Sequence, residues 1–345
     1  MKVLMMHSPA SLVVRGGLHV QVQKTTEAVR ALGIEVVSAS SLGEQPLRGF
    51  DLCHILGANM ATYHVGRELH RKGVPLVVSP VFFSLHSPGY LRRALRLQSM
   101  VGLLWRGVWT EYGFVAELCR WARAVLPNTR AEAKLLCDGF GISANNVSVV
   151  PNGVDERFCA AKPDAFRDRY DIDKFILYVG QLDEGRKNTL TLIRILNSMD
   201  VPAVIIGQSE DTAFADRCGV EAARNPRLVL IDALPNDSGL LASAYAACDV
   251  FVLPSLFETP GLAALEAALA GAKIVITKYG GTEEYFASWA EFVDPRSERS
   301  IRRGIQTALS KPRGSELREH VRKNFLWSEV GKKTLEGYQM ALHRI

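Results

Sequence analysis

The sequence predicts an α/β protein made of two doubly wound, parallel-sheet domains. Three observations indicate this fold class. The chain has 345 residues, which suits about two domains of ~150 residues each. Short apolar runs rich in Val, Ile and Leu recur along it, and helix-like segments separate most of them. Hydrophobic residues make up 48% of the chain and charged residues 22%, which is typical of a globular protein and excludes a mainly disordered one.

Six candidate strands fall in each half of the chain. In the first half they are Val3–Met6, Val36–Ser38, Leu52–Leu56, Leu76–Phe83, Ala124–Leu126 and Val147–Val150. In the second half they are Phe175–Val179, Ala203–Ile206, Leu228–Ile231, Val250–Leu253, Lys273–Thr277 and Glu291–Val293. Such runs alternating with helices predict parallel sheets covered on both faces, and hence two Rossmann-like domains rather than one closed barrel.

The turn residues of Val150–Phe158 mark the expected domain boundary, because they follow the last strand of the first pattern. We expect an N-terminal domain over residues 1–152 and a C-terminal domain over 153–326. The final segment, Trp327–Ile345, predicts an amphipathic helix that packs back onto the first domain. Two such domains facing each other place the default ligand site in a cleft, at the carboxyl ends of the strands.

The cysteines and the N-terminal segment indicate the expected cellular compartment. The six cysteines are scattered and form no Cys-x-x-Cys pair, which argues against a zinc or redox motif and indicates reduced thiols in a cytosol. His7 and Pro9 interrupt the first apolar run and Arg15 ends it, so a buried strand is favoured over a signal peptide. No window reaches about 18 uninterrupted apolar residues, so we expect no transmembrane helix and a cytoplasmic protein.

The net charge of +5 is unevenly distributed. Residues 1–155 hold 16 basic and 10 acidic side chains (+6), whereas residues 156–345 hold 25 basic and 26 acidic ones (−1). The total is too small to indicate nucleic-acid binding, and no recognition helix or basic strand with interleaved aromatics supports it. The excess in the first half is a clue to an acidic or membrane-linked partner of that domain.

The strongest motif is Glu258-Thr-Pro-Gly-Leu-Ala-Ala-Leu-Glu266, directly after a predicted strand. Gly261 and Leu262 fall where a helix starts, so their backbone N–H groups can bind phosphate. Glu266, about one turn further on, is placed to hold a ribose diol, and Glu258 lies in the loop where it can meet a sugar ring. The alternative is a solvated Glu258 and a Glu266 that interacts with the helix dipole.

The stretch Tyr245–Ala270 around this motif resembles the nucleotide-sugar site of glycosyltransferase family 4, a large retaining family with the GT-B fold. Further pieces resemble the family in the expected order: Arg15-Gly16-Gly17, Val125–Leu136, Val149–Phe158, Gly180–Asn188 and Gly280–Glu284. The resemblance spans nearly the whole chain and is more specific in the second half than in the first.

The resemblance implies that Arg186 and Lys187 bind the donor diphosphate and that no metal is obligatory. A solvated Arg-Lys pair beside the positive end of a helix is unfavourable, which also favours an anionic partner. Where the family usually has Arg, this chain has Gln181, which carries no charge. The expected donor-binding residues lie in segments that follow predicted strands. They are Gly16, Gly17, Gln181, Arg186, Lys187, Thr259, Pro260, Gly261, Leu262 and Glu266.

Two features of the first domain have both a functional and a structural interpretation. Many relatives place a histidine near the reacting sugar, and His86 is the candidate here, although a lone histidine is more often structural. Segment 90–109 combines helically spaced Leu and Trp with Arg92, Arg93 and Arg96. This pattern suits peripheral contact with an anionic membrane, but an ordinary helix with solvated arginines explains it as well.

These observations predict a retaining, metal-independent glycosyltransferase that moves a sugar from a nucleoside-diphosphate sugar to a glycan, lipid-linked or small-molecule acceptor. Glu258, Lys187 and His86 are the candidate catalytic residues, and no cofactor is expected. The expected context is synthesis of a polysaccharide, lipopolysaccharide, glycolipid or natural-product glycoside. The alternatives are a catalytically weak nucleotide- or glycan-binding protein and a non-hydrolysing nucleotide-sugar epimerase.

Overall fold

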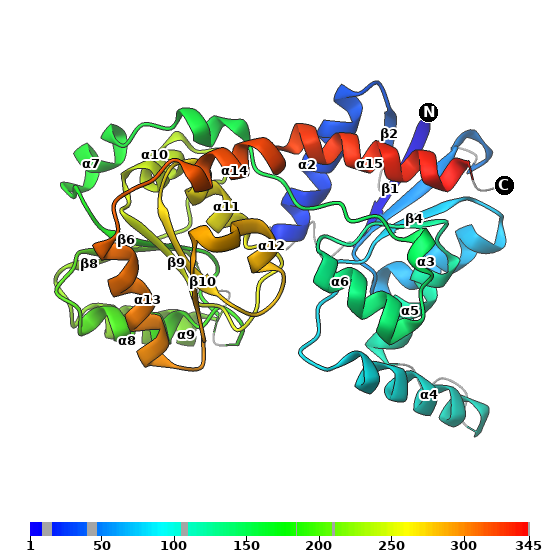
Figure 1. Ribbon diagram of the computed structural model, residues 1–345, viewed down its shortest axis with the longest axis horizontal. Helices are drawn as coiled ribbons and strands as arrows, with labels where there is room; N and C mark the ends of the chain where they lie inside the picture. The colour runs from blue at the N-terminus through cyan, green and yellow to red at the C-terminus, as the bar shows by residue number, and fades with distance from the viewer. Residues whose placement is uncertain (9–15, 40–46, 105–109, 184, 209–210, 344–345) are drawn as a thin grey trace. The chain divides into compact units, whose positions relative to one another are not determined.

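The chain forms two compact units, each built on its own parallel sheet (Figure 1). Unit 1 comprises Met1–Gly153 and Trp327–Ile345, and unit 2 comprises Val154–Leu326. The computed structural model describes residues 1–8, 16–39, 47–104, 110–183, 185–208 and 211–343. The α/β class with two parallel sheets, predicted from the alternating apolar runs, is confirmed.

Unit 1 contains a five-stranded sheet with the order β2-β1-β3-β4-β5. Its strands are β1 (Lys2–His7), β2 (Glu35–Ser38), β3 (Leu52–Leu56), β4 (Leu76–Ser79) and β5 (Ala124–Val125). Its α-helices are α2 (Gly17–Ala31), α3 (Met60–Arg71), α4 (Pro88–Leu104), α5 (Glu111–Trp121), α6 (Arg130–Lys134) and α15 (Trp327–Leu342). It also has the 3-10 helices η2 (Leu47–Gly49) and η4 (Ala144–Asn146) and the π-helix η3 (Leu135–Gly139). The continuous apolar runs of the strands are buried, as expected for a sheet covered on both faces.

Two strand predictions in this unit are wrong. Val147–Val150 lies beside β5, where the amides of Ser148 and Val150 donate to backbone carbonyls, but it makes only one β-bridge, between Val125 and Val147. A longer ladder fails because the neighbouring backbone includes Pro127, which has no N–H. The run predicted to end at Phe83 stops at Ser79, since Pro80 follows and Val81 takes a left-handed backbone with φ 54°.

Unit 2 contains a six-stranded sheet with the order β11-β10-β9-β6-β7-β8. Its strands are β6 (Ile176–Val179), β7 (Ala203–Ile206), β8 (Leu228–Ile231), β9 (Val250–Leu253), β10 (Lys273–Thr277) and β11 (Glu291–Val293). Counted from β6, this is the 3-2-1-4-5-6 order of a Rossmann fold. All six strands lie where the sequence predicts them, and β6 begins one residue later than expected.

Helices cover both faces of the unit 2 sheet (Figure 1). They are α7 (Asp164–Tyr170), α8 (Thr189–Asn197), α9 (Thr212–Ala222), α10 (Gly239–Ala247), α11 (Leu262–Leu269), α12 (Thr282–Phe286), α13 (Glu298–Ser310) and α14 (Glu316–Asn324), with turns η5 (Glu156–Ala160) and η6 (Ala287–Trp289). One hydrophobic core runs through the unit, and Tyr178, Tyr245 and Phe251 are among its fully buried side chains.

The C-terminal helix α15 packs against α2, β4 and β5 of unit 1. Its Tyr338 hydroxyl lies 2.9 Å from Nδ1 of the buried His54 on β3, and His54 Nε2 lies 2.9 Å from Ser79 Oγ on β4. Burial lowers the pKa of His54 to about 3, so this histidine is neutral and joins three elements of the unit. None of the helices in the described ranges is long and apolar enough to cross a bilayer.

Candidate functional site

The motif-bearing loops of unit 2 meet where the strand order of its sheet reverses. Strands β6 and β9 are neighbours in the sheet, although two strands, β7 and β8, lie between them in the chain order. The loop 180–188 follows β6 and the loop 254–261 follows β9. Ligands of doubly wound sheets bind at this kind of switch point, outside the carboxyl ends of the strands.

Glu258 is the centre of this edge. It is 4% exposed, and its carboxylate accepts from Lys187 Nζ at 2.7 Å and forms an ion pair with Arg186 Nη1 at 3.3 Å. Burial raises the pKa of Glu258, but the Lys187 ammonium and the Arg186 guanidinium outweigh it and hold the pKa below the usual value. A buried, ionised carboxylate therefore lies between the two cations that the sequence assigns to a diphosphate.

The backbone fixes the position of Glu258. Its N–H donates to the Tyr279 carbonyl at 3.1 Å, and its own carbonyl accepts from the Gly281 N–H at 3.0 Å. Gly280, between these two partners, has φ 104°, and a Cβ atom there would overlap the Glu258 carbonyl oxygen. Only glycine allows this close approach, so the loop after β10 holds Glu258 in place.

Two further contacts join the loops. The Leu256 N–H donates to the Arg186 carbonyl at 2.8 Å. The Asn188 side-chain amide donates to the Pro254 carbonyl at 3.2 Å and to the Pro295 carbonyl at 2.8 Å, so that it ties together the ends of β6, β9 and β11. Asn188 caps α8 with φ 58°, a left-handed conformation that asparagine tolerates better than most residues.

Helix α11 starts at Leu262 with Gly261 as its N-cap, at the position predicted from sequence. Gly261 has φ 84°, which favours glycine, and it follows the cis peptide Thr259–Pro260. Pro260 and Gly261 are buried, whereas Thr259 and Leu262 are half-buried. The first amides of α11 have no partner within the helix, so they are available in principle to an anion.

Glu266 lies on α11 and is 7% exposed. The Asn236 amide donates to its Oε1 at 2.9 Å, and the Tyr245 hydroxyl donates to its Oε2 at 2.8 Å. Burial raises the pKa of Glu266, and these neutral donors offset only part of the effect. Glu258 and Glu266 thus have different partners: cations hold the first, and neutral hydrogen-bond donors orient the second.

Gln181 follows β6 and has an exposed side chain. Its carbonyl accepts from the buried Tyr178 hydroxyl at 2.8 Å, while Thr189 donates to that same hydroxyl at 3.2 Å. The residue that replaces the family's usual arginine is therefore held by its backbone, with its side chain in solvent.

The other predicted residues belong to unit 1. Gly16 is the N-cap of α2 and Gly17 is its first residue, as the sequence predicts, while the preceding Arg15 lies outside the described residues. His86 is exposed in the turn before α4, where its ring stacks on Tyr90 with centroids 4.1 Å apart. The structure brings Arg186, Lys187 and Glu258 together within unit 2, and it presents His86 at the surface of unit 1.

Sequence analysis missed the residues that support these side chains. Tyr245 and Asn236 orient Glu266, and the Arg157 guanidinium donates to the Asn236 carbonyl while lying over the Phe158 ring. A buried tyrosine hydroxyl usually has a polar partner, so Tyr245 offered a weak signal within a recognised motif. Nothing in the sequence pattern singled out Asn236.

Glu132 in unit 1 was also missed. It is 1% exposed, and its carboxylate accepts the backbone N–H groups of Phe82 and Asn128, both at 2.7 Å. These amides lie in the loops after β4 and β5, at the carboxyl edge of the unit 1 sheet. The Gln21 amide donates to Asn128 at 3.1 Å and connects the same loops to α2.

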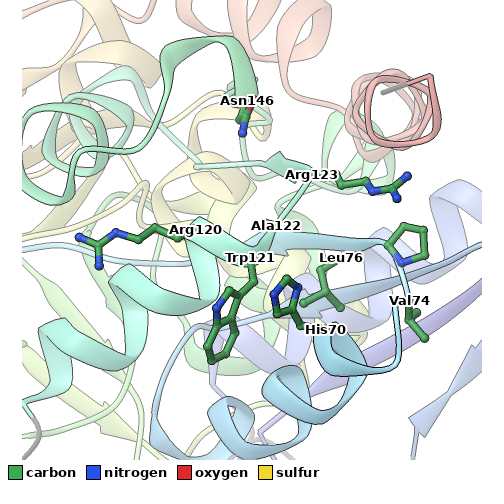
Figure 2. Close-up of a pocket in the computed structure, with 10 residues that line it drawn as sticks. His70, Val74, Leu76, Arg120, Trp121, Ala122, Arg123 and Asn146 are labelled. Atoms are coloured by element: carbon green, nitrogen blue, oxygen red, sulfur yellow. The ribbon is translucent and has the colours of Figure 1, made fainter. Parts of the chain in front are cut away.

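Unit 1 also has a pocket of about 430 Å³ beside the start of β4 and the end of α5 (Figure 2). His70 and Trp121 stack in its wall with ring centroids 5.4 Å apart, and Arg120 and Arg123 extend in different directions. It lies at the amino-terminal edge of the sheet, whereas ligand sites of parallel sheets lie at the carboxyl edge. Arg120 lies in the last turn of α5 and Arg123 directly follows this helix, so both complement its C-terminal end and we assign no ligand to this pocket.

No cluster of three or more His, Cys, Asp or Glu side chains suited to a metal ion occurs among the described residues. The candidate site comprises two cations, two buried glutamates and the first backbone amides of α11.

Comparison with known proteins connects this geometry to a family. Residues 164–325 match the family of group 1 glycosyl transferases, and residues 47–158 match Glycosyltransferase Family 4. The chain is 25% identical to the MMP alpha-(1->4)-mannosyltransferase of Mycolicibacterium hassiacum, over 81% of this chain and 68% of that protein. Among three curated relatives, the matched region spans 40% to 68% of their own length.

Solved structures share the fold along the whole chain. Sucrose-phosphate synthase from Thermosynechococcus elongatus has a TM-score of 0.76 at 19% identity and covers 100% of both chains. Anabaena HepE, solved in complex with UDP and glucose, has a TM-score of 0.73 at 17% identity and covers 98% of this chain and 99% of that one. The family matches together cover more than half of the 345 residues, and the two parallel-sheet domains are those of the GT-B fold. The chain belongs to the group 1 glycosyltransferases of family 4.

Proposed function

We propose that this protein is a retaining glycosyltransferase that takes its sugar from a nucleoside diphosphate held by unit 2. The observation that carries the proposal is the pairing of Lys187 and Arg186 with the buried Glu258 at the β6–β9 switch point. Two adjacent cations at the carboxyl edge of a Rossmann sheet suit a diphosphate, whose charge they balance. The UDP bound by Anabaena HepE, which shares the fold, supports this class of donor.

Each predicted donor residue has a proposed role. Glu266, oriented by Asn236 and Tyr245, accepts hydrogen bonds from the ribose hydroxyls. Lys187 and Arg186 contact the diphosphate together with the first amides of α11, and Glu258 accepts from hydroxyls of the sugar. Gln181, Thr259, Pro260, Gly261 and Leu262 shape the loops around the donor, and Gly16 and Gly17 are further proposed donor-binding residues.

The proposed reaction proceeds on one face of the sugar. The bond between the anomeric carbon and the diphosphate oxygen breaks, and the acceptor oxygen bonds to the same face of that carbon. The acceptor hydroxyl gives its proton to the departing diphosphate, so charge and atoms balance without a base from the protein. Lys187 and Arg186 stabilise the charge that develops on the leaving group. His86 is the proposed unit 1 residue near the reacting sugar.

The cations make an obligatory metal unnecessary in this scheme, since they supply the positive charge that a metal would give. Excess EDTA should therefore leave the initial rate of sugar transfer unchanged. A rate that falls with EDTA and returns with added Mg²⁺ or Mn²⁺ would contradict metal independence while leaving the donor class intact.

Helix α4 is the proposed contact with a membrane or an acidic acceptor. Within α4, Leu91 is buried, whereas Leu97 is 62% and Met100 65% exposed. Arg92, Arg93 and Arg96 are exposed as well, and α4 contains no acidic residue. Apolar and cationic side chains on one exposed helix face suit the surface of anionic lipid. Residues 105–109 of the predicted segment lie outside the described part of the chain.

Vesicle sedimentation tests this contact. The protein should pellet with phosphatidylglycerol-containing vesicles and not with neutral phosphatidylcholine vesicles, and replacing the three arginines by glutamine should release it. Equal pelleting of the triple variant and the parent would show that these arginines are ordinary solvated side chains.

A thermal-shift panel of nucleotide sugars tests the donor site, because a ligand of the folded state raises its melting temperature. One or more nucleotide sugars should stabilise the parent protein, and Glu266→Ala should abolish the shift. Glu319→Ala is the matched control, since Glu319 pairs with Arg322 at the surface of the same unit. Equal shifts in the parent and Glu266→Ala would overturn the donor-site assignment. Slow donor hydrolysis on prolonged incubation would separate an enzyme from a binding protein.

A further inference from the structure

Glu258 forms ion pairs with the same two cations that the proposed diphosphate would contact. Its carboxylate lies 2.7 Å from the Lys187 ammonium and 3.3 Å from the Arg186 guanidinium. The Lys187 side chain is only 13% exposed, so bulk water screens this pair weakly. Any phosphate oxygen drawn to Lys187 must therefore approach a fixed negative charge as well as a positive one.

The loop cannot relieve this repulsion by moving Glu258 away. The backbone of Glu258 is bonded on both sides to the loop after β10, and Gly280 packs against its carbonyl. Glu258 is also buried, and a buried carboxylate that loses its donors pays the full cost of desolvation. A ligand that takes charge from the cations is thus favoured only if it gives Glu258 new hydrogen-bond donors.

Resting on the donor site proposed above, we infer that Glu258 is a specificity-determining residue that makes unit 2 prefer an intact nucleotide sugar over the bare nucleoside diphosphate. The hydroxyls of the sugar donate to Glu258 when the diphosphate engages Lys187 and Arg186. A free diphosphate brings at least as much negative charge, because its terminal phosphate has one more ionisable oxygen, but it brings no sugar hydroxyls to face Glu258. The spent nucleotide is therefore bound more weakly than the donor, which favours its release after transfer.

A carboxylate beside two cations has a second physically reasonable role, which is to hold them in position for the diphosphate. That role predicts the opposite effect on diphosphate affinity when the charge of Glu258 is removed. If the carboxylate served mainly to hold Lys187 and Arg186 in position, removing its charge would disorder the cations and weaken every diphosphate ligand. If the carboxylate competes with the diphosphate, removing its charge strengthens the binding of a diphosphate that lacks a sugar.

Calorimetry with inorganic pyrophosphate separates these roles, because this probe carries neither base nor sugar. In Glu258→Gln the affinity for pyrophosphate should rise about tenfold, the size expected when a unit charge a few ångströms away is removed from a partly screened site. Glu258→Asp keeps the charge on a shorter side chain and should give a smaller rise. Glu291→Gln is the control, since it removes the same charge from the partly exposed Lys311–Glu291 pair at the start of β11 and should leave the affinity unchanged.

Nucleotide pairs extend the test to the sugar. UDP against UDP-glucose and GDP against GDP-mannose should each show a donor preference in the parent protein that falls in Glu258→Gln. Pyrophosphate affinity that is unchanged or weaker in both Glu258 variants would overturn the inference. If Glu258→Gln does not fold, the rise in Glu258→Asp decides the matter.

Lys187→Ala distinguishes failure of this inference from failure of the donor site. Pyrophosphate that binds the parent but not Lys187→Ala, with no gain in Glu258→Gln, would leave the donor site standing and remove only the competition. Equal binding to the parent and Lys187→Ala would remove both. Pyrophosphate that binds Glu258→Gln but not the parent would support the competition, and no binding to either would overturn it.

Discussion

Each sheet has a buried glutamate at its carboxyl edge, and the two glutamates are satisfied in different ways. Glu132 of unit 1 is 1% exposed and accepts the backbone N–H groups of Phe82 and Asn128. Glu258 of unit 2 is 4% exposed, accepts from the Lys187 side chain and forms an ion pair with Arg186. Backbone amides cannot leave their places, so Glu132 braces two loops permanently.

The cations beside Glu258 are on flexible side chains that can turn towards a ligand. The comparison therefore separates a structural role from a binding role for the same residue type at equivalent places in two α/β sheets. Strands β3 and β4 of unit 1 are also joined without charge, since His54 is buried in its neutral form beside Ser79 and Tyr338. This difference leads us to place the donor in unit 2.

The largest effect is expected for Lys187→Ala, which tests whether the unit 2 cations bind a ligand. Removing one preorganised donor from a site of developing negative charge typically lowers turnover about 10²–10³-fold, and we expect that loss in sugar transfer. The measurement is a steady-state transfer or donor-hydrolysis assay with the donor identified by thermal shift. Lys311→Ala, which breaks a partly exposed pair with Glu291, is the control and should retain activity. Full turnover in Lys187→Ala would mean that the cations of unit 2 are structural after all.

The second prediction concerns the stability of unit 1 around the buried, neutral His54 and how this stability depends on pH. His54 has a pKa of about 3 in the folded protein and about 6.5 when unfolded, so the unfolded chain binds the extra proton between these values. Its contribution to stability is fully present above pH 6.5 and is lost as the pH falls towards 3. At pH 4.5 the loss should be on the order of 3 kcal/mol, because each of the two pH units below 6.5 removes a little over 1 kcal/mol.

Hydrogen exchange of peptides that span β3 measures this loss within unit 1. His54→Gln, which cannot gain the proton, should be less stable at neutral pH but should show a flatter decline between pH 6.5 and 4.5. The same slope in the parent and in His54→Gln would show that other groups set the acid sensitivity of this unit.

The brace itself is tested by Glu132→Gln. An amide of the same shape can accept only one of the two N–H groups and presents its own N–H to the other. The loss of one charge-assisted hydrogen bond should cost about 2 kcal/mol in unit 1. Exchange at the Phe82 and Asn128 amides should speed up, while peptides of β6 and β9 stay as in the parent. Protection of both amides in the variant would contradict the proposed brace.

Much of the fold could be predicted because burial on both faces leaves a mark in the sequence. β7, β9 and β10 begin and end at the predicted residues, since their apolar runs are continuous. Val147–Val150 has the same composition but makes only one bridge, because pairing depends on the backbone donors of its neighbour. Composition cannot show that dependence.

Only some residues of the site could be predicted, because the contacts between them also depend on the tertiary fold. Lys187 and Glu258 could be placed after strands, but their pairing spans 71 positions and depends on β6 lying next to β9. Tyr245 and Asn236 act through Glu266, and no local pattern marks such support. Val81, in a left-handed conformation beside the Glu132 brace, is likewise imposed by tertiary contacts against the preference of a β-branched residue.

Gln181 offers the smallest and most specific test of the difference between the two edges. Its exposed side chain follows β6, where the family usually has arginine, so Gln181→Arg adds a third cation beside Arg186 and Lys187 without disturbing the core. An exposed charge is worth up to about 1 kcal/mol, so nucleoside-diphosphate affinity should rise about two- to fivefold and the gain should shrink at high salt. Gln306→Arg, at an exposed position of α13 in the same unit, is the matched control. If both substitutions raise the affinity equally, the gain reflects the net charge of unit 2, whereas a gain confined to residue 181 means that the diphosphate lies at the β6–β9 switch point.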